Sequence, residues 1–330
     1  MIRLLQVELT RLRWRRAILA LTAVAVLIPV VIFAAVSWNT RPVSEAEQQQ
    51  IEQRVEDESD QPYVQRDLAR CLRKPQEYGV PPGADVEQTC TEQVLPQPEW
   101  FASRPPLDLR EQSREGSGVA LIVLLGCLML VAGTTFVGHD WNSGSMSNQL
   151  LFEPRRARVW WGKALVVLAY GLVVSGLVLT AYWTGLYAVS SARDLAIEPG
   201  ELSGVYAQAL RGTLLAGGAA VGGYALTMLL RSTVATLGIL FAVSIAAPLL
   251  LALLAFPGND RLMPHNNGIA LINDGVRISD YDDPACLDGP TERNECVTVI
   301  TRRDGAAYFG SLLLVVGVPS LLLFRRRDVP

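Results

Sequence analysis

The chain has 330 residues, half of them hydrophobic, and a formal net charge of −3. A chain of this length could form two or three soluble domains, but its apolar residues gather in blocks long enough for a helix to cross a bilayer. This distribution excludes an ordinary soluble protein, and the slightly negative charge gives no reason to expect a nucleic-acid partner.

Six apolar blocks are predicted to be transmembrane helices, because only helices satisfy their own backbone hydrogen bonds within a single segment in lipid. The blocks cover residues 17–36, 118–138, 164–189, 207–230, 233–256 and 305–324. The expected fold class is therefore an all-α polytopic membrane protein. Arginines before the first block also fit a signal peptide, but a run of about 20 residues is longer than a usual signal-peptide core. We expect it to remain as a membrane helix.

The distribution of Lys and Arg predicts the orientation of the helices. One set of connecting segments is rich in arginine and poor in acidic residues, and the other set is more acidic than basic. The basic set is 1–16, 139–163, 231–232 and 325–330, and the acidic set is 37–117, 190–206 and 257–304. The positive-inside rule assigns the basic set to the cytoplasm. We therefore expect a multi-pass protein of the plasma (inner) membrane with both termini cytoplasmic and the acidic set extracytoplasmic.

The extracytoplasmic segment 37–117 is expected to contain a helical hairpin closed by a disulfide. Apolar residues at helical spacing place Cys71 on one face of a helix and Cys90 on one face of the next, and a Pro- and Gly-rich turn separates the two. Disulfides persist outside the cytoplasm. The stretch "SEAEQQQIEQRVEDESD" before the hairpin has few apolar residues, so it is either a solvated helix or partly disordered.

The loop 139–163 is the segment that most suggests a function. Its start, "HDWNSGS", favours turns, and the following "SMSNQLLFE" fits about two turns of helix. Met146 and Leu150 share one face of that helix, Leu151 lies alongside, and Pro154 ends it. Positive-inside charges explain the arginines that follow, but nothing in the loop covers the apolar face. We interpret this face as one that binds in the groove of a cytoplasmic partner.

The fourth span is rich in glycine, which permits close contact between helices. The glycines expected to take part in packing are Gly217, Gly218, Gly222 and Gly223. Whether they pack within the chain or against a second copy stays open. Arg211 is the charged residue within this span, and we expect it to extend to the outer interface. The scarcity of intramembrane charge argues against an ion- or proton-coupled transporter.

The segment 257–304 is expected to hold a second disulfide, between Cys286 and Cys296, which bracket a turn-rich loop. The runs "VRIS" and "CVTVIT" are β-like and fit a hairpin. A cluster of aspartates could in principle bind calcium; its members are Asp280, Asp282, Asp283 and Asp288. A calcium site is disfavoured because the ordered spacing of a calcium-binding loop is missing. Neither cysteine pair has further ligands at metal spacing, so no metal is expected.

The sequence shows no set of residues suited to catalysis. Gly162 and Lys163 lack the rest of a GxxxxGK[ST] phosphate loop. The two histidines, His139 and His265, fall on opposite sides of the predicted membrane. We therefore expect neither enzymatic activity nor a cofactor in this chain, so the energy for vectorial work must come from another protein.

The six-span layout and the loop after the second span resemble the permease subunits of type 2 ABC transporters, a six-span class of exporters. The pattern is an acidic residue, a Gly with a hydroxyl residue, a leucine-rich turn, Pro-x-Arg, and a Lys that opens the third span. In this chain these positions are Asp140, Gly144, Ser145, Leu150, Leu151, Pro154, Arg156 and Lys163. Asp in place of Glu and Ser in place of Thr are mild departures. The segment between the first two spans is longer than in simple members.

The resemblance implies both a mechanism and a set of partners. Residues 1–16 resemble the amphipathic helix that lies along the inner membrane surface in this family, and "LLRSTVA" resembles its tight cytoplasmic turn. Two permease copies, expected as a homodimer, would face each other above two copies of a separate ATPase subunit that binds ATP and Mg. The helix 144–153, including Met146, would dock on that ATPase. The expected cargo is a lipid, a hydrophobic drug or a peptide.

Three other functions stay open. An ABC-type complex could transmit force to extracytoplasmic partners, which the long outer hairpin would favour. The chain could also be a membrane scaffold or sensor without an ATPase partner. An intramembrane enzyme is the least expected, because catalytic groups are missing.

Overall fold

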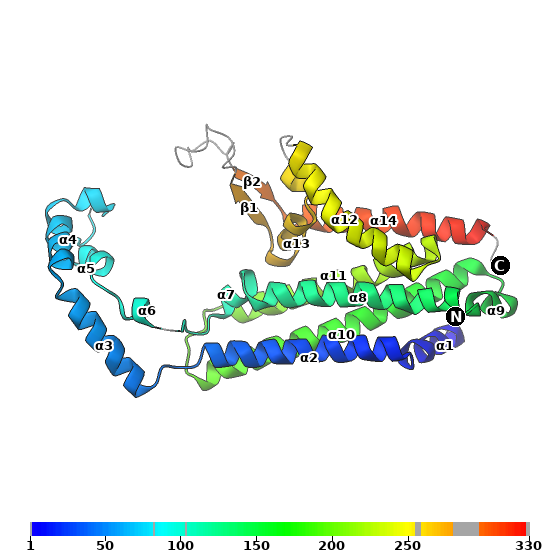
Figure 1. Cartoon of the computed structure of the whole chain (residues 1–330), viewed down its shortest axis with the longest axis horizontal. Coiled ribbons are helices and arrows are strands. Elements are labelled where there is room, and N and C mark those ends of the chain that lie inside the picture. Colours follow the sequence, from blue (N-terminus) through cyan, green and yellow to red (C-terminus); the bar gives the residue numbers. More distant parts are fainter. Residues whose placement is uncertain (1, 82, 103, 255–258, 280–296, 328–330) are drawn as a thin grey trace. The chain divides into compact units, whose positions relative to one another are not determined.

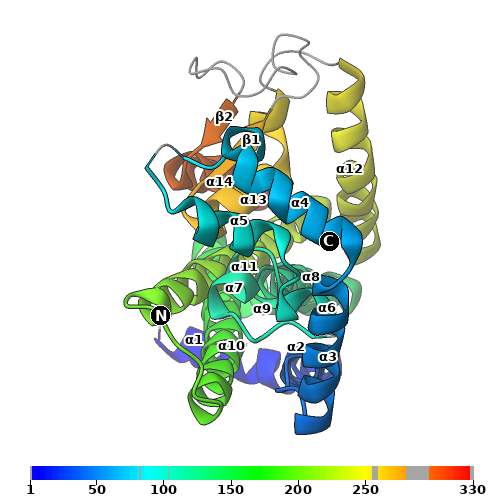
Figure 2. The same ribbon diagram turned by 90° about the vertical axis from the view of Figure 1, so that its left-hand side faces the viewer.

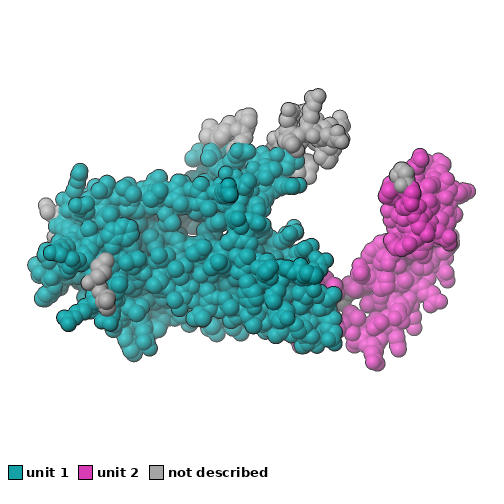
Figure 3. Space-filling model, turned by 180° about the vertical axis from the view of Figure 1, so that it is seen from behind, with its two compact units in different colours: residues 1–33, 108–330 teal, residues 34–107 magenta. Residues whose placement is uncertain are grey.

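The computed structural model of the chain describes residues 2–81, 83–102, 104–254, 259–279 and 297–327. It is mostly helical and divides into two compact units (Figures 1 and 3). Unit 1 comprises residues 1–33 and 108–330, and unit 2 comprises residues 34–107.

Among the described residues, six helices are long and apolar enough to cross a membrane, which confirms the predicted number of spans. They are α2 (Arg16–Asn39), α8 (Ser117–Asn142), α10 (Arg156–Ala192), α11 (Glu201–Leu230), α12 (Thr233–Leu254) and α14 (Arg302–Arg326). Five of the helices extend beyond their predicted blocks, because hydropathy marks the part of a helix that suits lipid and not its polar end turns, whereas α12 starts at Thr233 as predicted. The predicted loop 139–163 is therefore shorter than expected, and His139 and Asp140 belong to α8.

Helix α11 is the centre of unit 1 and packs against α8, α10 and α14 (Figure 2). Glycines let the backbones of α8 and α11 touch. A Cβ added to Gly133 of α8 would lie 2.0 Å from the carbonyl oxygen of Ala220, and one added to Gly223 would lie 2.2 Å from that of Leu130. Any larger side chain at either position would force the two helices apart.

The four glycines predicted for packing all face neighbours within the chain. Gly217 faces α10, Gly218 and Gly222 face Leu313 of α14, and Gly223 faces α8. These glycines therefore serve three different helices. The sequence left open whether they pack within the chain or against a second copy, and the structure shows contacts within the chain.

Two short helices, α1 (Ile2–Arg13) and α9 (Ser145–Phe152), lie at the same end of unit 1 (Figure 1). We call this the basic end; it also includes the start of α10 and the end of α14. Helix α1 packs against α10 and buries Glu8 and Leu12. The helix predicted for residues 1–16 is thus present. One of its charged residues, Glu8, is buried rather than solvated.

The remaining elements of unit 1 are short, namely α7 (Leu109–Arg114), η2 (Asn259–Leu262), α13 (Pro264–Asn273), β1 (Val276–Ser279) and β2 (Val297–Ile300). The two strands pair antiparallel, with Val276 opposite Ile300. The β-hairpin predicted in this segment is therefore confirmed. The fold is mostly α-helical with one two-stranded sheet, and not all-α as predicted. Arg211, which was expected to extend to the outer membrane interface, forms an ion pair with Asp274 at 3.6 Å. Its charge is therefore paired with a residue of the protein.

Two predictions for the segment 257–304 fall on residues that the structure does not describe. They are the Cys286–Cys296 disulfide and the aspartate cluster Asp280, Asp282, Asp283 and Asp288.

Unit 2 is built from short helices, namely α3 (Glu45–Ser59), α4 (Pro62–Arg73), η1 (Pro75–Tyr78), α5 (Val86–Val94) and α6 (Pro98–Phe101). The acidic stretch, for which the sequence allowed either a solvated helix or partial disorder, forms the helix α3. This helix starts with a capping box between Ser44 and Glu47. The backbone N–H of Ser44 donates to the Glu47 carboxylate and, with help from Arg104, holds its pKa below the ordinary value.

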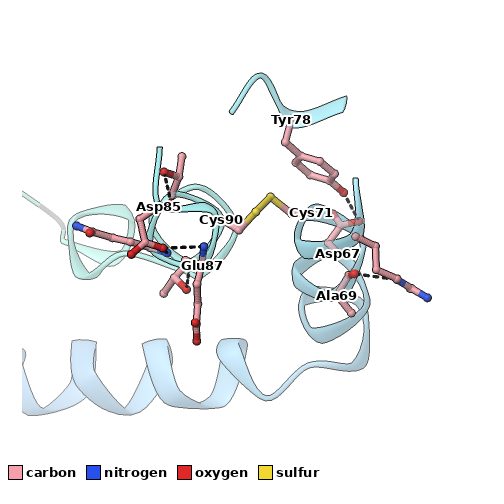
Figure 4. The surroundings of a disulfide bond; sticks show 11 residues. Asp67, Ala69, Cys71, Tyr78, Asp85, Glu87 and Cys90 are labelled. Carbon is pink, nitrogen blue, oxygen red and sulfur yellow. Dashed lines mark hydrogen bonds between the residues drawn. A yellow bond between two sulfur atoms is a disulfide. The ribbon is translucent and has the colours of Figure 1, made fainter. Parts of the chain in front are cut away.

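The predicted helical hairpin and its disulfide are both present in unit 2. Cys71 of α4 is bonded to Cys90 of α5, with their Cα atoms 5.8 Å apart (Figure 4). The two cysteines and Val80 form a small buried cluster. A loop of about 20 residues is closed by this bond, which contributes roughly 3 kcal/mol in the entropic model.

Candidate functional site

The basic end contains a set of buried charged side chains from three helices. Glu8 of α1, Asp140 of α8 and Lys163 of α10 have side chains that are 0 %, 1 % and 0 % exposed. The Nζ of Lys163 donates to Glu8 Oε2 and to Asp140 Oδ2, both at 2.7 Å. Because an unpaired buried charge is strongly unfavourable, these contacts fasten α1, α8 and α10 to one another.

Arg15, in the turn between α1 and α2, completes the charge balance. Its guanidinium pairs with Asp140, donates to the carbonyl oxygen of Phe136, and lies 4.8 Å from the centre of the Phe136 ring. Glu8, Asp140, Lys163 and Arg15 together carry two negative and two positive charges. We call these four residues the ionic cluster. Its neutrality and its direct contacts are typical of a structural fastening.

The ionic cluster also holds the short helix α9. Ser145 Oγ donates to Asp140 Oδ1 at 2.8 Å, and Gln149 Nε2 donates to Glu8 Oε1 at 2.5 Å. The carboxylates that pair with Lys163 therefore also accept hydrogen bonds from the first and second turns of α9. The helix is fixed at both turns against the end of the bundle.

A glycine directs the chain from α8 into α9. Gly144 has a φ of 68°, in the left-handed region where a residue without a Cβ is favoured. The resemblance placed a Gly followed by a hydroxyl residue at this position. The structure gives each a physical role, because Gly144 makes the turn and Ser145 bonds to the ionic cluster.

The exposed apolar side chains of α9 are not the ones that the sequence predicted. Met146 is fully buried, so the expectation that it belongs to an uncovered apolar face is wrong. The loop appears isolated only in the sequence; in the fold, α9 packs against α8. Leu150 is partly exposed, whereas Leu151 is 80 % and Phe152 is 90 % exposed. Sequence reasoning missed Phe152, although it extends the apolar run of Leu150 and Leu151 and lies two residues before Pro154.

The Pro-x-Arg part of the pattern connects α9 to α14. Pro154 is exposed and lies between the end of α9 and the start of α10. The guanidinium of Arg156 donates to the carbonyl oxygens of Phe324, at 3.4 Å, and Arg327. A cation is favourable at a helix C-terminus, where the last carbonyls lack partners. Arg156 thus caps α14 and ties its end to α10.

Aromatic residues pack beneath the ionic cluster. The buried Tyr224 of α11 donates to the carbonyl oxygen of Trp160 at 2.9 Å, and the two rings meet edge to face. Trp160 Nε1 donates to Ser320 Oγ of α14 at 3.1 Å. Trp160 is 4 % exposed, whereas Trp161 is half exposed.

Sequence reasoning missed Glu8, Arg15 and Gln149 as members of this site. Arginines at this end were explained by the positive-inside rule, which treats them as solvated. A signal was nevertheless present, because Glu8 is the only acidic residue before Glu45. A single acid in a basic amphipathic segment needs a reason, and here the reason is Lys163.

The charged groups of the site are paired with one another, and the described part of the chain places no metal site there. Both carboxylates of the ionic cluster are engaged by cations. Among the described residues, no group of three or more His, Cys, Asp or Glu side chains could hold a metal ion. What the arrangement offers is a short helix, rigidly attached, whose last two residues are apolar and exposed.

No protein-family model, no curated protein and no solved structure matches the chain. The assignment of a function therefore depends on the residue pattern and on the geometry of the basic end.

Proposed function

We propose that the chain is the membrane-spanning permease subunit of an ATP-driven export complex, and that α9 docks on a separate ATPase subunit. One observation carries this proposal: Leu151 and Phe152 are almost fully exposed at the tip of a helix whose other side is fixed by the ionic cluster. A docking element needs both properties, an uncovered apolar tip and a rigid attachment.

The exposed tip has a clear energetic reason to bind a partner. Full burial of a Leu or Phe side chain contributes about 1.5–3 kcal/mol each. A groove that covered both would therefore gain about 3–6 kcal/mol from these two residues, before the losses of association. Short apolar helices are commonly recognised in grooves of this kind.

The attachment explains how motion of a partner would reach the membrane helices. The ionic cluster joins α9 to α1, α8 and α10, and Arg156 joins α10 to the end of α14. Packed interiors have low compressibility and transmit displacement. A push on α9 would therefore move several spans together.

The remaining parts of the proposal follow from the resemblance and from the apolar composition of the spans. ATP and Mg bind on the ATPase subunit, which is present in two copies. A second copy of this chain completes the pathway as a homodimer in the plasma membrane, with the basic end in the cytoplasm. A nearly charge-free bundle suits a lipid, a hydrophobic drug or a peptide as cargo.

A second function is favoured by unit 2. Its disulfide-closed helical module is larger than a simple connection between two spans requires. Such a module would suit a complex that transmits force to extracytoplasmic partners. ATP-driven movement of a substrate into vesicles that contain the purified complex would exclude force transmission as the sole role.

Docking is tested by the double substitution Leu151→Asp and Phe152→Asp. Both side chains are exposed, so the chain should still fold. The complex is purified from native membranes in mild detergent, and the ATPase activity that copurifies is measured. We expect that activity and transport to be lost. Asn148→Asp, an exposed change on the same helix, adds one negative charge away from the tip, where the double variant adds two, and should retain both activities.

Two results would contradict the assignment. If the double variant copurifies as much ATPase activity as the wild type and still transports, α9 is not the docking element. If no ATPase copurifies with the wild type, the chain is a scaffold or sensor. Met146→Asp is not informative here, because Met146 is buried and a charge at that position would disrupt the fold.

A further inference from the structure

A cavity of about 690 Å³ opens at the basic end of unit 1, beside the ionic cluster. It lies between the start of α2, the last turns of α8 and the first residue of α12. Residues that line it include Trp14, Arg16, Thr135, His139, Asn142 and Thr233. Its volume is within the range of small-molecule sites, and the docking proposal makes no use of it.

The α8 side of the cavity is polar. Thr135, His139 and Asn142 follow one another at spacings of four and three residues, so they share one face of the helix. Residues 118–133 of α8 are all apolar, and a polar stripe at the end of such a membrane helix normally marks a site or a path. These side chains supply hydrogen-bond groups without negative charge.

The α2 side of the cavity is positively charged. Arg15 and Arg16 line it, and the residues of the lining that the structure describes include no Asp or Glu. Arg15 is engaged by Asp140. Arg16 is exposed and has no ion-pair partner among the described residues. The cavity therefore contains a cation whose charge nothing in the described chain balances.

The backbone adds to this preference for an anion. Helix α2 begins at Arg16, and the first N–H groups of a helix have no acceptor within the helix. The lining includes the first turn, Arg16 to Ile18. Free N–H groups and the helix dipole favour negative charge at such a position. The lining thus combines a basic side chain with the N-terminal turn of a helix.

The surroundings of the cavity distinguish a lipid from a free anion. Trp14 at its edge is 72 % exposed, as is typical of an aromatic residue at the level of lipid headgroups. Directly beyond Arg16, α2 presents exposed apolar residues, Leu19 among them. An acyl chain could lie along that surface while its headgroup occupies the cavity.

We propose that this cavity binds the phosphate of an anionic membrane lipid, with Arg16 as its main charged contact. The described residues of the lining include no carboxylate, which favours a headgroup with net negative charge over one that also carries a choline. Basic pockets between membrane helices bind anionic headgroups in this way. The site is independent of the docking of α9.

The test compares lipid binding to purified full-length chain in detergent. Native mass spectrometry measures binding of phosphatidylglycerol and of phosphatidylcholine with the same acyl chains, with and without excess inorganic phosphate. We expect preference for phosphatidylglycerol, and a loss of about fivefold in its affinity for Arg16→Gln, as one basic residue near a lipid phosphate contributes. Arg3→Gln removes the same charge from an exposed position in α1 outside the cavity, and should leave the affinity unchanged.

Three results would overturn the proposal. Equal affinity for the two lipids would show that the headgroup charge is not recognised. An equal loss in Arg3→Gln and Arg16→Gln would show only the general field of the basic end. Displacement of the lipid by inorganic phosphate, abolished by Arg16→Gln, would identify a site for a free anion.

Discussion

Replacing Lys163 with Met tests whether the ionic cluster holds the basic end together. Lys163 is fully buried, and its Nζ lies 2.7 Å from both Glu8 and Asp140. Met fills a similar volume, so the change removes charge without opening a large cavity. Asp140 would keep Arg15 as a partner, but among the described residues Glu8 would keep only the hydrogen bond from Gln149 and the ion pair with Arg11 at 3.9 Å.

The expected loss of stability follows from this imbalance. Removing one partner of a buried ion pair costs about 3–5 kcal/mol, because the other charge stays buried. For a unit of this size, a loss of 1 kcal/mol lowers the Tm by about 2 °C. The Tm of Lys163→Met should therefore fall by about 6–10 °C.

Thermal unfolding of the purified chain in detergent, followed by tryptophan fluorescence, measures this change. Arg158→Met is the matched control, since it breaks the half-exposed Arg158–Glu153 pair, which is worth at most about 1 kcal/mol. Adding Glu8→Gln to Lys163→Met removes the stranded charge and should restore part of the Tm. The reasoning is refuted if Lys163→Met melts within about 2 °C of the control, or if Glu8→Gln adds to the loss.

Two further predictions concern helix packing and unit 2. Gly133→Ala should destabilise unit 1 by about 1–3 kcal/mol or more, because its Cβ would meet the backbone oxygen of Ala220. Gly126→Ala, where nothing lies within 4 Å, should be neutral or stabilising in the same melting assay. Equal effects of the two substitutions on the Tm would contradict the packing argument. Cys71→Ser should remove roughly 3 kcal/mol from the hairpin of unit 2, seen as faster proteolysis between residues 62 and 95, and a free Cys71 or Cys90 in the wild type would disprove the disulfide.

Much of the fold was predictable because its causes are local in sequence. Apolar runs of sufficient length define the six spans, and apolar spacing around Cys71 and Cys90 defined the hairpin and its disulfide. The Cys286–Cys296 bond rests on the same kind of reasoning and stays a prediction, which mass mapping of disulfide-linked peptides would check.

The architecture of the basic end was less predictable because it depends on contacts between distant residues. Lys163 pairs with Glu8 across 155 positions, and no spacing rule relates them. The positive-inside rule explained the arginines of this end as a group, which concealed the separate roles of Arg15 and Arg156. Met146 was expected to be uncovered because the loop was considered alone, without the bundle end against which α9 packs.

The measurement that tests the account most directly is the side of the membrane on which the tip of α9 lies. Phe152→Cys is introduced together with Cys127→Ala, which removes the free exposed cysteine among the described residues. A membrane-impermeant maleimide is then applied to intact cells and to inside-out vesicles. Trp100→Cys, an exposed position in unit 2, is the opposite marker. The account predicts that Cys at position 152 reacts only in inside-out vesicles and Cys at position 100 only in intact cells. Labelling of position 152 in intact cells would contradict it, because no cytoplasmic ATPase could then reach α9.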